Sequence, residues 1–186
     1  MIKIGKNLSK FSNYSCQPKT KAEFKSIIYD RMEKEGPNCD LNDIDTSLIT
    51  DMFYLFRNLD FNGDISKWNV SNVTNMSYMF TNSTFNGDIS KWNVSNVTSM
   101  ASMFAYTDFT GDISKWDTSS VINMSRMFED AKFNGDISNW NVSNVTDMTW
   151  MFAYSKFNGD ISKWNISSDC CTMYMFRGRQ KQDRSN

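Results

Sequence analysis

The sequence predicts an α/β solenoid, a stack of right-handed coils with a parallel β-sheet on one face and short helical returns on the other. A block that begins Phe61-Asn-Gly-Asp-Ile-Ser-Lys-Trp and closes with Met79-Phe80 recurs along most of the chain. Its glycine, its tryptophan and its closing Met-Phe pair return at intervals of 24 residues. A fixed period in this range is typical of solenoids, in which each repeat is one supersecondary unit stacked on the next.

The 186 residues divide into four segments. Residues 1–18 show no periodicity and are expected to form a flexible N-terminal arm, and residues 177–186 are expected to form a basic tail. Between them we predict a capping helix within residues 19–36 and six 24-residue repeats in residues 37–176. The first and last repeats are atypical, as the ends of a stack must be where their outer faces meet water.

The helix is predicted over about residues 20–35. Thr20 and Glu23 form a Thr-x-x-Glu capping box, and Gly36-Pro37 supplies a stop signal. Apolar residues such as Phe24 and Ile28 fall on one helical face. Because this stripe must be covered, we expect the helix to pack on the open end of the first coil.

Each repeat is expected to contain a turn, a short strand, a loop and a helical return. Asn62-Gly63-Asp64 is turn chemistry, since glycine tolerates positive φ and the aspartate accepts bonds from local backbone N–H groups. Alternation of Trp68 and Val70 predicts a strand over residues 67–71, and apolar spacing of three to four over residues 73–80 predicts a helical or 3₁₀ turn. The tryptophans of successive coils are expected to stack at the strand spacing of about 4.8 Å.

The net charge of −1 is unevenly distributed. Residues 1–36 carry +4, residues 37–176 carry −8 and residues 177–186 carry +3. An acidic body argues against a duplex-binding surface, because neutralising phosphates requires a basic stripe. No apolar run approaches the ~20 residues of a membrane span, and the N-terminus lacks the apolar core of a signal peptide. We expect neither a nucleic-acid partner nor membrane insertion.

The sequence offers little for catalysis or cofactor binding. Histidine is absent, which removes Ser-His and Cys-His nucleophiles together with the commonest metal ligand. The four cysteines match no metal-binding pattern and are interpreted as reduced thiols, with a Cys16–Cys39 bridge as the alternative. Asp64 and its counterparts form a repeated carboxylate row, which we interpret as turn caps because calcium requires six to eight oxygens. We predict no enzyme activity and no cofactor.

The recurring tract Phe-Asn-Gly-Asp-Ile-Ser-x-Trp-Asn-Val-Ser-x-Val-Thr-x-Met-x-x-Met-Phe resembles the BspA-like leucine-rich repeats of bacterial surface proteins, a type known as a mycoplasma family of unknown function. The resemblance covers residues 38–176, and the spacing of Ile65, Trp68 and Val70 matches the Leu-x-x-Leu-x-Leu signature. Val73 stands where ordinary leucine-rich repeats carry asparagine or cysteine, so their asparagine ladder is not expected. The resemblance implies adhesion and protein–protein interaction at the cell surface or after secretion, while the absence of a recognisable signal peptide leaves a cytoplasmic location open.

The first candidate binding surface is the face of the predicted sheet. Its outward positions flank the buried tryptophan and valine of each strand and repeat along the stack. The candidate residues are Lys67, Asn69, Lys91, Asn93, Lys115, Asp117, Asn141, Lys163 and Asn165. The alternative is that these near-identical rows only support the stack.

The second candidate surface consists of two rows that vary from coil to coil while their neighbours do not. They are Tyr78, Ser102, Arg126, Trp150 and Tyr174, and Asn82, Tyr106, Asp130 and Tyr154. Trp150 and Tyr154 are four residues apart, so a helical return would place them side by side. Together with Tyr106 they are candidates for partner binding, because tryptophan and tyrosine dominate interface energies. The alternative is that the rings fold back onto the protein.

These observations predict a monomeric, non-catalytic interaction module of the adhesin type, whose partners are proteins at host or cell surfaces. The alternative function is structural, with coils associating end to end or edge to edge. Asp169 and Thr172 argue against that at the C-terminal end, because they place polar groups in two core rows. Binding to a repetitive surface through the Thr74 row is disfavoured because Ile122 interrupts that row.

Overall fold

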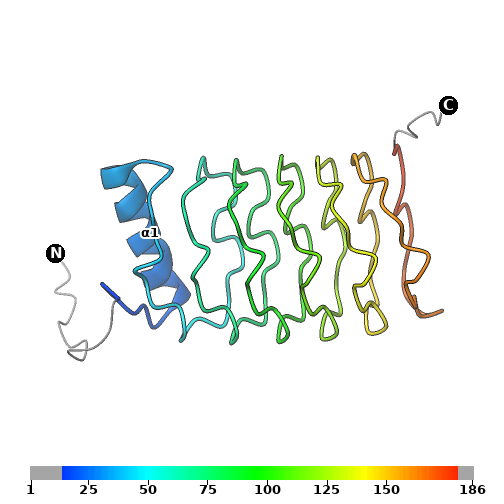
Figure 1. The fold of residues 1–186 in the computed structure, drawn as a ribbon, viewed down its shortest axis with the longest axis horizontal. Coiled ribbons are helices and arrows are strands. Elements are labelled where there is room, and N and C mark those ends of the chain that lie inside the picture. Colours follow the sequence, from blue (N-terminus) through cyan, green and yellow to red (C-terminus); the bar gives the residue numbers. More distant parts are fainter. Residues whose placement is uncertain (1–13, 180–186) are drawn as a thin grey trace.

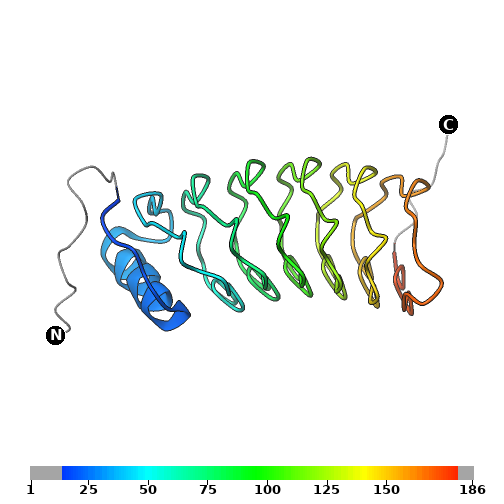
Figure 2. The same cartoon turned by 90° about the horizontal axis from the view of Figure 1, so that it is seen from below.

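The computed structural model describes residues 14–179. This part of the chain contains one helix, α1 (Lys21–Glu35), followed by turns and isolated β-bridges. Figure 1 shows the repeats as successive coils stacked along one axis, with α1 covering the N-terminal end. Figure 2, turned by 90°, shows the same arrangement, in which each coil lies against its neighbours in sequence. A side chain 24 residues away in the sequence is therefore a neighbour in space.

The predicted sheet is wrong, and with it the α/β solenoid fold class. Parallel pairing within residues 14–179 is limited to isolated bridges such as Asn75–Ser99. Two backbone amides of the predicted strand over residues 67–71 are used locally: the N–H of Trp68 donates to the C=O of Ile65 at 3.1 Å, and that of Ser71 donates to Asn69 Oδ1 at 3.1 Å. The N–H of Lys67 donates to a side chain of the preceding coil, Asn42 Oδ1, at 2.7 Å. A sheet requires such amides to pair with the neighbouring strand. Because amides of this segment are hydrogen-bonded within turns, no strand forms there.

The predicted helical return is also wrong. Residues 76–83 form consecutive β-turns, the first closed by a 3.2 Å bond from the N–H of Met79 to the C=O of Met76. Tyr78 and Asn82 have φ values of 58° and 51°. A left-handed residue in the third position is the mark of a type II turn. The apolar spacing of three to four therefore reflects a succession of turns, which repeats at nearly the interval of a helical turn.

Alternate amides of this turn segment join one coil to the next. The N–H of Met76 donates to the C=O of Ser99 at 2.9 Å, and the N–H of Phe80 donates to the C=O of Met103 at 3.0 Å. The amides between them close the local turns, so the backbone groups of the return find partners without a sheet. The coils are thus bonded to each other through turns.

The predicted core rows are confirmed. The side chains of Ile65, Trp68 and Val70, and of their counterparts in the later regular coils, are buried. Phenylalanines and tryptophans form columns through the stack: the ring centroids of Phe80 and Phe104 are 5.6 Å apart, and those of Trp68 and Trp92 are 6.3 Å apart. The tryptophan spacing exceeds the predicted value because offset rings have centroids further apart than their planes.

Each tryptophan of the buried column also bonds to the preceding coil. The Nε1–H of Trp92 donates to the C=O of Ile65 at 3.2 Å, and that of Trp116 donates to the C=O of Ile89 at 3.1 Å. Burying an indole N–H without a partner would cost about 1–3 kcal/mol. The indole therefore requires a coil of the same geometry beneath it.

The predicted capping helix is confirmed as α1. Thr20 Oγ1 accepts a bond from the N–H of Glu23 at 3.1 Å, while the Glu23 carboxylate accepts from the N–H of Lys19 at 2.9 Å. This is a capping box shifted by one residue, since the reciprocal bond usually goes to the N-cap residue. Gly36, at φ 86°, ends the helix.

The helix packs on the first coil through Phe24 and Ile28, which are fully buried. The ring of Phe24 lies 4.9 Å from that of Trp68. Ile44 occupies the tryptophan row in the first coil, so Phe24 supplies an aromatic ring next to Trp68 on the side where no indole stands. An ion pair between Arg31 and Asp43 at 3.0 Å joins the helix to the same coil.

Part of the predicted N-terminal arm is attached to the first coil. The backbone of Cys16 forms an isolated parallel β-bridge with that of Ile44, and Gln17 Nε2 donates a hydrogen bond to Asp45 Oδ2 at 2.6 Å. The remainder of that arm, residues 1–13, and residues 180–186 of the predicted basic tail lie outside the described residues. Cys16 and Cys39 are free thiols, so the alternative bridge between them is not formed.

The repeat glycine is required by the close approach of a ring, and not by positive φ as predicted. The repeat glycines do not have positive φ. Among the glycines of residues 14–179, positive φ is found at Gly36 and Gly178. A Cβ atom placed on Gly111 would lie 2.7 Å from Cζ of Phe109. Real Cβ atoms do not approach other atoms this closely, so only glycine fits beside the buried ring.

Replacing Gly111 by alanine is therefore expected to destabilise the protein by about 1–3 kcal/mol through overpacking of Phe109. Urea denaturation followed by circular dichroism measures this change in the free energy of unfolding. Lys115→Ala, an exposed change in the same coil, is the control and should stay within about 0.5 kcal/mol of the original protein. Equal stability of the two variants would contradict the steric argument.

Candidate functional site

The two varying rows lie on an edge of the stack that we call the ridge. It consists of the turn positions in the left-handed conformation, where φ lies between 50° and 65°. These positions are Tyr54, Asn58, Tyr78, Asn82, Ser102, Tyr106, Arg126, Asp130, Trp150, Tyr154, Tyr174 and Gly178. A side chain larger than glycine is strained in this conformation by about 1–2 kcal/mol. Bulky aromatic residues at these positions therefore need an explanation beyond local stability.

Towards the C-terminal end, the ridge carries aromatic and charged side chains that touch one another. We call Tyr106, Arg126, Glu129, Trp150, Tyr154, Tyr174 and Arg177 the ridge cluster. The ring of Trp150 lies 6.1 Å from that of Tyr154 and 5.2 Å from that of Tyr174. The predicted proximity of Trp150 and Tyr154 is confirmed, although successive turns and not a helix bring them together.

Two arginines from neighbouring coils approach the Trp150 ring. The guanidinium carbon of Arg126, in the preceding coil, is 5.1 Å from the ring centroid, and that of Arg177, in the following coil, is 5.3 Å away. Cation–π contacts of this kind contribute about 0.5–1 kcal/mol at exposed sites. They hold the indole in place although it is partly exposed.

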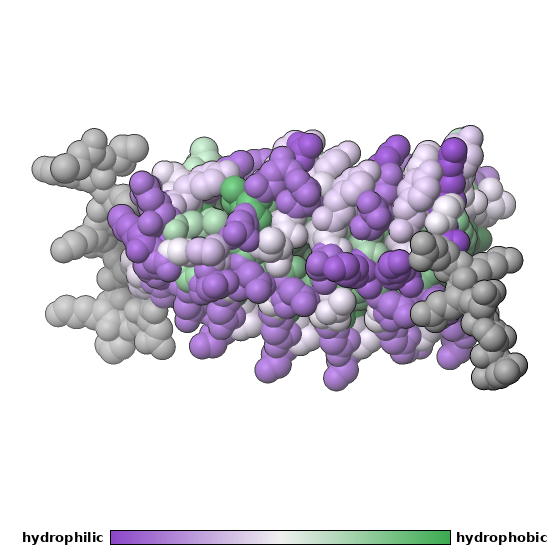
Figure 3. Space-filling view, turned by 90° about the horizontal axis from the view of Figure 1, so that it is seen from above, coloured by the Kyte–Doolittle hydropathy of each residue, from purple (hydrophilic) through white to green (hydrophobic). Residues whose placement is uncertain are grey.

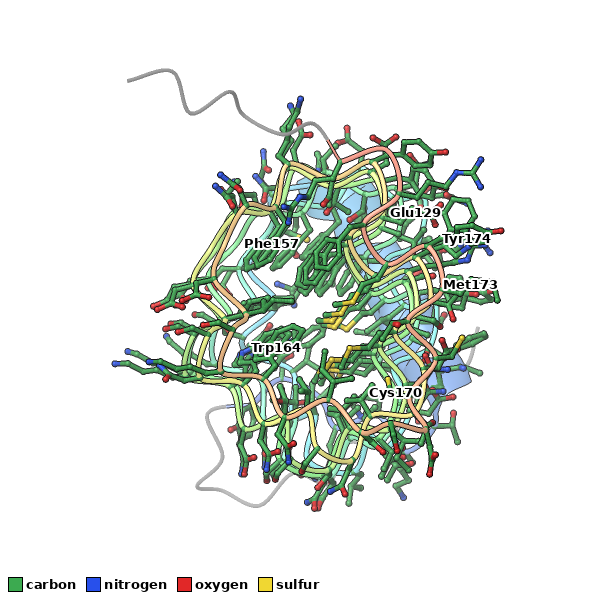
Figure 4. The ribbon with its side chains drawn as sticks, turned by 90° about the vertical axis from the view of Figure 1, so that its right-hand side faces the viewer. Glu129, Phe157, Trp164, Cys170, Met173 and Tyr174 are labelled. Atoms are coloured by element: carbon green, nitrogen blue, oxygen red, sulfur yellow. The ribbon has the colours of Figure 1, made fainter. Side chains whose placement is uncertain are left out.

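A buried carboxylate orients one of these arginines. The Glu129 side chain is only 7% exposed, and its two oxygens accept bonds from Arg126 Nη1 at 3.1 and 2.8 Å. The same position carries Ala105 and Ala153 in the adjacent coils. A buried charge is costly unless it is paired. The ion pair with Arg126 offsets the cost of burying the Glu129 carboxylate where the adjacent coils carry alanine. Figure 4 shows Glu129 and Tyr174 on the same side of the coil cross-section, away from Trp164.

Tyr106 borders this pair of charges, and Tyr154 lies beside Trp150. Tyr106 is 48% exposed, and partial burial, followed by the charge and hydrogen bonding of Glu129, raises the pKa of its phenol. Tyr154 is 47% exposed and lies over Gly178, where an added Cβ would be 2.3 Å from the ring. Gly178 thus leaves room for Tyr154 at the last turn of the ridge.

Comparison with protein families gives a match over most of the chain. Residues 24–108 and residues 105–186 each match the family model described as Mycoplasma protein of unknown function, DUF285. The chain belongs to this family. No curated protein and no solved structure matches it. The double match agrees with the internal repetition, since two copies of the family model fit successive sets of coils.

In this member of the Mycoplasma family, the first predicted binding surface loses its basis because no sheet exists in residues 14–179. The residues named for it are exposed: Lys67, Asn69, Lys91, Asn93, Lys115, Asp117, Asn141, Lys163 and Asn165. Several of them serve local turns, as Asn69 does by accepting bonds from the N–H and Oγ–H of Ser71 at 3.1 and 2.7 Å. Figure 3 shows that hydrophilic side chains cover much of the surface seen from above, with smaller hydrophobic patches between them.

The interpretation of the aspartate row as turn caps is confirmed. Asp64 Oδ1 accepts a bond from the N–H of Ser66 at 2.9 Å, and Asp88, Asp112, Asp136 and Asp160 do the same in their own coils. These backbone bonds hold the pKa of each carboxyl below its ordinary value of 3.8. No three cysteine or acidic side chains within residues 14–179 gather as a metal site, and no helix there could cross a membrane.

An asparagine ladder is present one position before the valine row. Nδ2 of Asn72 donates to the C=O of Ser47 at 2.8 Å, and Nδ2 of Asn96 donates to the C=O of Ser71 at 2.7 Å. Val73 itself is buried, as expected. The side-chain ladder therefore runs along the exposed neighbour of the core row.

Sequence reasoning missed two members of the ridge cluster, Glu129 and Arg177. They belong to one row, which carries Arg57, Thr81, Ala105, Glu129, Ala153 and Arg177. The alternation of charged and small residues in this row was a usable signal. The row directly follows the buried Phe80 row in the sequence, so spacing alone does not separate it from the interior.

Because the turn-capping aspartates must be ionised to stabilise the fold fully, we expect the protein to lose stability at acid pH. Because their folded-state pKa values are lowered, they stabilise the protein above the ordinary value of 3.8, and this contribution disappears as the pH falls through the folded-state values. Urea denaturation should give a free energy of unfolding that is steady between about pH 7 and 5 and declines below about pH 4.

The matched control replaces Asp88, Asp112 and Asp136 by asparagine, which keeps the Oδ1 acceptor and removes the titration. This variant should show a shallower decline at low pH. An unchanged slope would mean that acid sensitivity arises from other carboxyl groups.

Proposed function

We propose that this Mycoplasma family member is a non-catalytic protein-interaction module that binds its partner through the ridge cluster. The observation that carries the proposal is the placement of Trp150, Tyr154 and Tyr174 at left-handed turn positions, with φ values of 62°, 57° and 58°. Gly178 occupies an equivalent position without such strain. Strained residues that the surrounding structure holds in place are typical of functional sites.

The composition of the cluster supports the same function. Tryptophan, tyrosine and arginine are enriched among the residues that contribute most to protein–protein affinity. The aromatic rings of Trp150 and Tyr174 and the guanidinium of Arg126 are already held by mutual contacts and by Glu129. Holding side chains in place before binding lowers the entropy lost on association.

The repeat tract supports an adhesin-type role at a cell surface. The tract resembles BspA-like leucine-rich repeats, and this resemblance implies contact with other proteins at surfaces. The residues of the ridge cluster come from four consecutive coils, and such a partner can contact all four. We propose this as the biological setting of the interaction.

Selection from a displayed random-peptide library tests the binding surface. Peptides should be enriched on the immobilised full-length protein, and the double variant Trp150→Ala, Tyr154→Ala should bind the selected peptides at least about tenfold more weakly, as loss of two aromatic anchors implies. The matched control is Lys91→Glu with Lys115→Glu, which should retain binding. Selected peptides that bind the aromatic variant as well as the original protein would overturn the placement.

Self-association is the second candidate, favoured by the exposed apolar residues of the last coil. Met173, Tyr174 and Phe176 are 58%, 50% and 38% exposed. The N-terminal end is covered by α1 (Figure 1), so copies cannot stack head to tail through bare coils. Of the end-to-end arrangements, a tail-to-tail dimer through the last described coil is the one compatible with this cover.

Light scattering of the full chain over a range of concentrations tests this alternative. A dimer that is lost in the variant Met173→Ser, Phe176→Ser would support tail-to-tail association. A monomer at high concentration removes it. Longer assemblies would contradict the blocking role of α1.

A further inference from the structure

We infer that the partner of the ridge cluster presents an extended acidic segment, whose carboxylates pair with Arg177 and whose backbone carbonyls meet the exposed amides of the last coil. This inference rests on the proposed function and names the chemistry of the partner. Three features of residues 14–179 carry it: the gathering of arginines at the ridge, the Arg177 guanidinium, which forms no ion pair there, and the backbone donors of the last described coil, which have no acceptor there.

The arginines of the coils gather at the ridge, whereas lysines are spread over several rows, among them Lys132 and Lys156, which follow the ridge positions Asp130 and Tyr154 by two residues. Beyond α1, the described arginines lie on the ridge or directly beside it, at Arg57, Arg126, Arg177 and Arg179. The row before the buried tryptophan carries only lysines as its cations. Arginine has a planar fork of donors that matches a carboxylate and stacks on aromatic rings, which lysine does not. The ridge therefore has the cation suited to pairing with carboxylates beside aromatic side chains.

Arg177 differs from Arg126 in having no carboxylate partner. Arg126 is neutralised by Glu129, whereas Arg177 contacts the rings of Trp150 and Tyr174 at 5.3 and 5.1 Å and forms no ion pair within residues 14–179. Stacking fixes the plane of the guanidinium and leaves its N–H groups available. A carboxylate from a partner can bind them in the bidentate geometry that gives such pairs their strength.

The last coil also carries backbone donors that lack acceptors. In earlier coils the corresponding amides bond to the next coil, as the N–H of Trp150 does to the C=O of Met173 at 3.1 Å. Thr172, Tyr174 and Phe176 are the equivalent positions of the last described coil, and no coil follows them in residues 14–179. An extended peptide laid across this end supplies carbonyl oxygens in the same way that an added strand does at a sheet edge. The N–H groups of Thr172, Tyr174 and Phe176 are donors, so a segment that lies along this side of the coil meets them with its carbonyl oxygens.

The charge distribution places such a segment at this end of the molecule. The body of the chain, residues 37–176, carries −8 and repels an acidic partner, whereas the described residues that follow it, 177–179, carry two arginines and no acidic residue. Arg179, stacked on Phe176 at 4.8 Å, adds a second cation beside Arg177. Asp130 is the exposed acid of the ridge, one coil before Tyr154. The charge along the ridge therefore changes from negative at Asp130 to positive at Arg177 and Arg179. This change orients the acidic segment towards the last described coil.

Fluorescence anisotropy with two labelled peptides tests the inference on the full-length protein. One peptide alternates glutamate with valine and leucine over nine residues, and the other has glutamine in place of each glutamate. The original protein should bind the glutamate peptide at least about tenfold more tightly, the effect of one charge-assisted pair. Raising the salt concentration should reduce this preference.

Arg177→Gln should abolish the preference for glutamate, and Arg177→Lys should retain part of it, since the charge remains and the planar fork is lost. Arg57→Gln is the matched control, because Arg57 lies in the same row at the other end and also stacks on a tyrosine, Tyr54, at 4.6 Å. It should leave the preference intact. Circular dichroism should show that all three variants fold, with similar small decreases in melting temperature for Arg177→Gln and Arg57→Gln, since both arginines are exposed and each loses cation–π contacts.

Equal affinity for the two peptides, no binding of either, or an equal loss with Arg57→Gln would overturn the inference. The library selection separates this failure from that of the proposed function. If the selected peptides depend on Trp150 and Tyr154 but contain no excess of aspartate or glutamate, the interaction surface stands and only its acidic partner is wrong. If they do not depend on those rings, the surface itself is wrong.

Discussion

The contact between one coil and the next is the interaction on which the whole structure depends. The tryptophan at the equivalent position of each regular coil is buried against its neighbours and donates its indole N–H to the preceding coil, as Trp116 does to Ile89. The phenylalanine columns run in parallel with the tryptophans through the stack. A single coil has no other surface on which to bury these rings. The sequence therefore keeps the 24-residue interval strictly in the core rows, because a shift in any coil would misalign two interfaces.

The polar residues of the repeat serve the same geometry. Aspartate or asparagine at the positions of Asp64, Asn69 and Asn75 accepts a bond from the backbone N–H two residues later. These caps turn the chain inward at short intervals, and they use amides that a strand would need. Most of the regularly repeated side chains are thereby committed to the fold. The ridge is different, since its side chains project from turns and can change from coil to coil without disturbing the core.

The two ends of the stack are unlike. At the N-terminal end, α1 places Phe24 on Trp68 and so completes the aromatic packing where the first coil has Ile44. At the other end of the described stack, apolar side chains such as Met173 are exposed, and the turn amides of the last described coil bond to no further coil within residues 14–179. The ridge cluster extends to this last described coil through Tyr174 and Arg177.

The sequence by itself determined the repeat, its register and its interior. The positions of Trp68 and Val70 in the core, the capping helix, and the role of Asp64 in a turn all follow from spacing and from local chemistry, which a single repeat already contains. The absence of a sheet did not follow, because alternation of apolar residues is compatible with a strand or with a chain of turns. Only the competition between local caps and inter-coil pairing for the same amides decides between them. The ridge cluster likewise required the tertiary structure, since Arg126, Trp150 and Arg177 come from three coils and meet only when those coils are stacked.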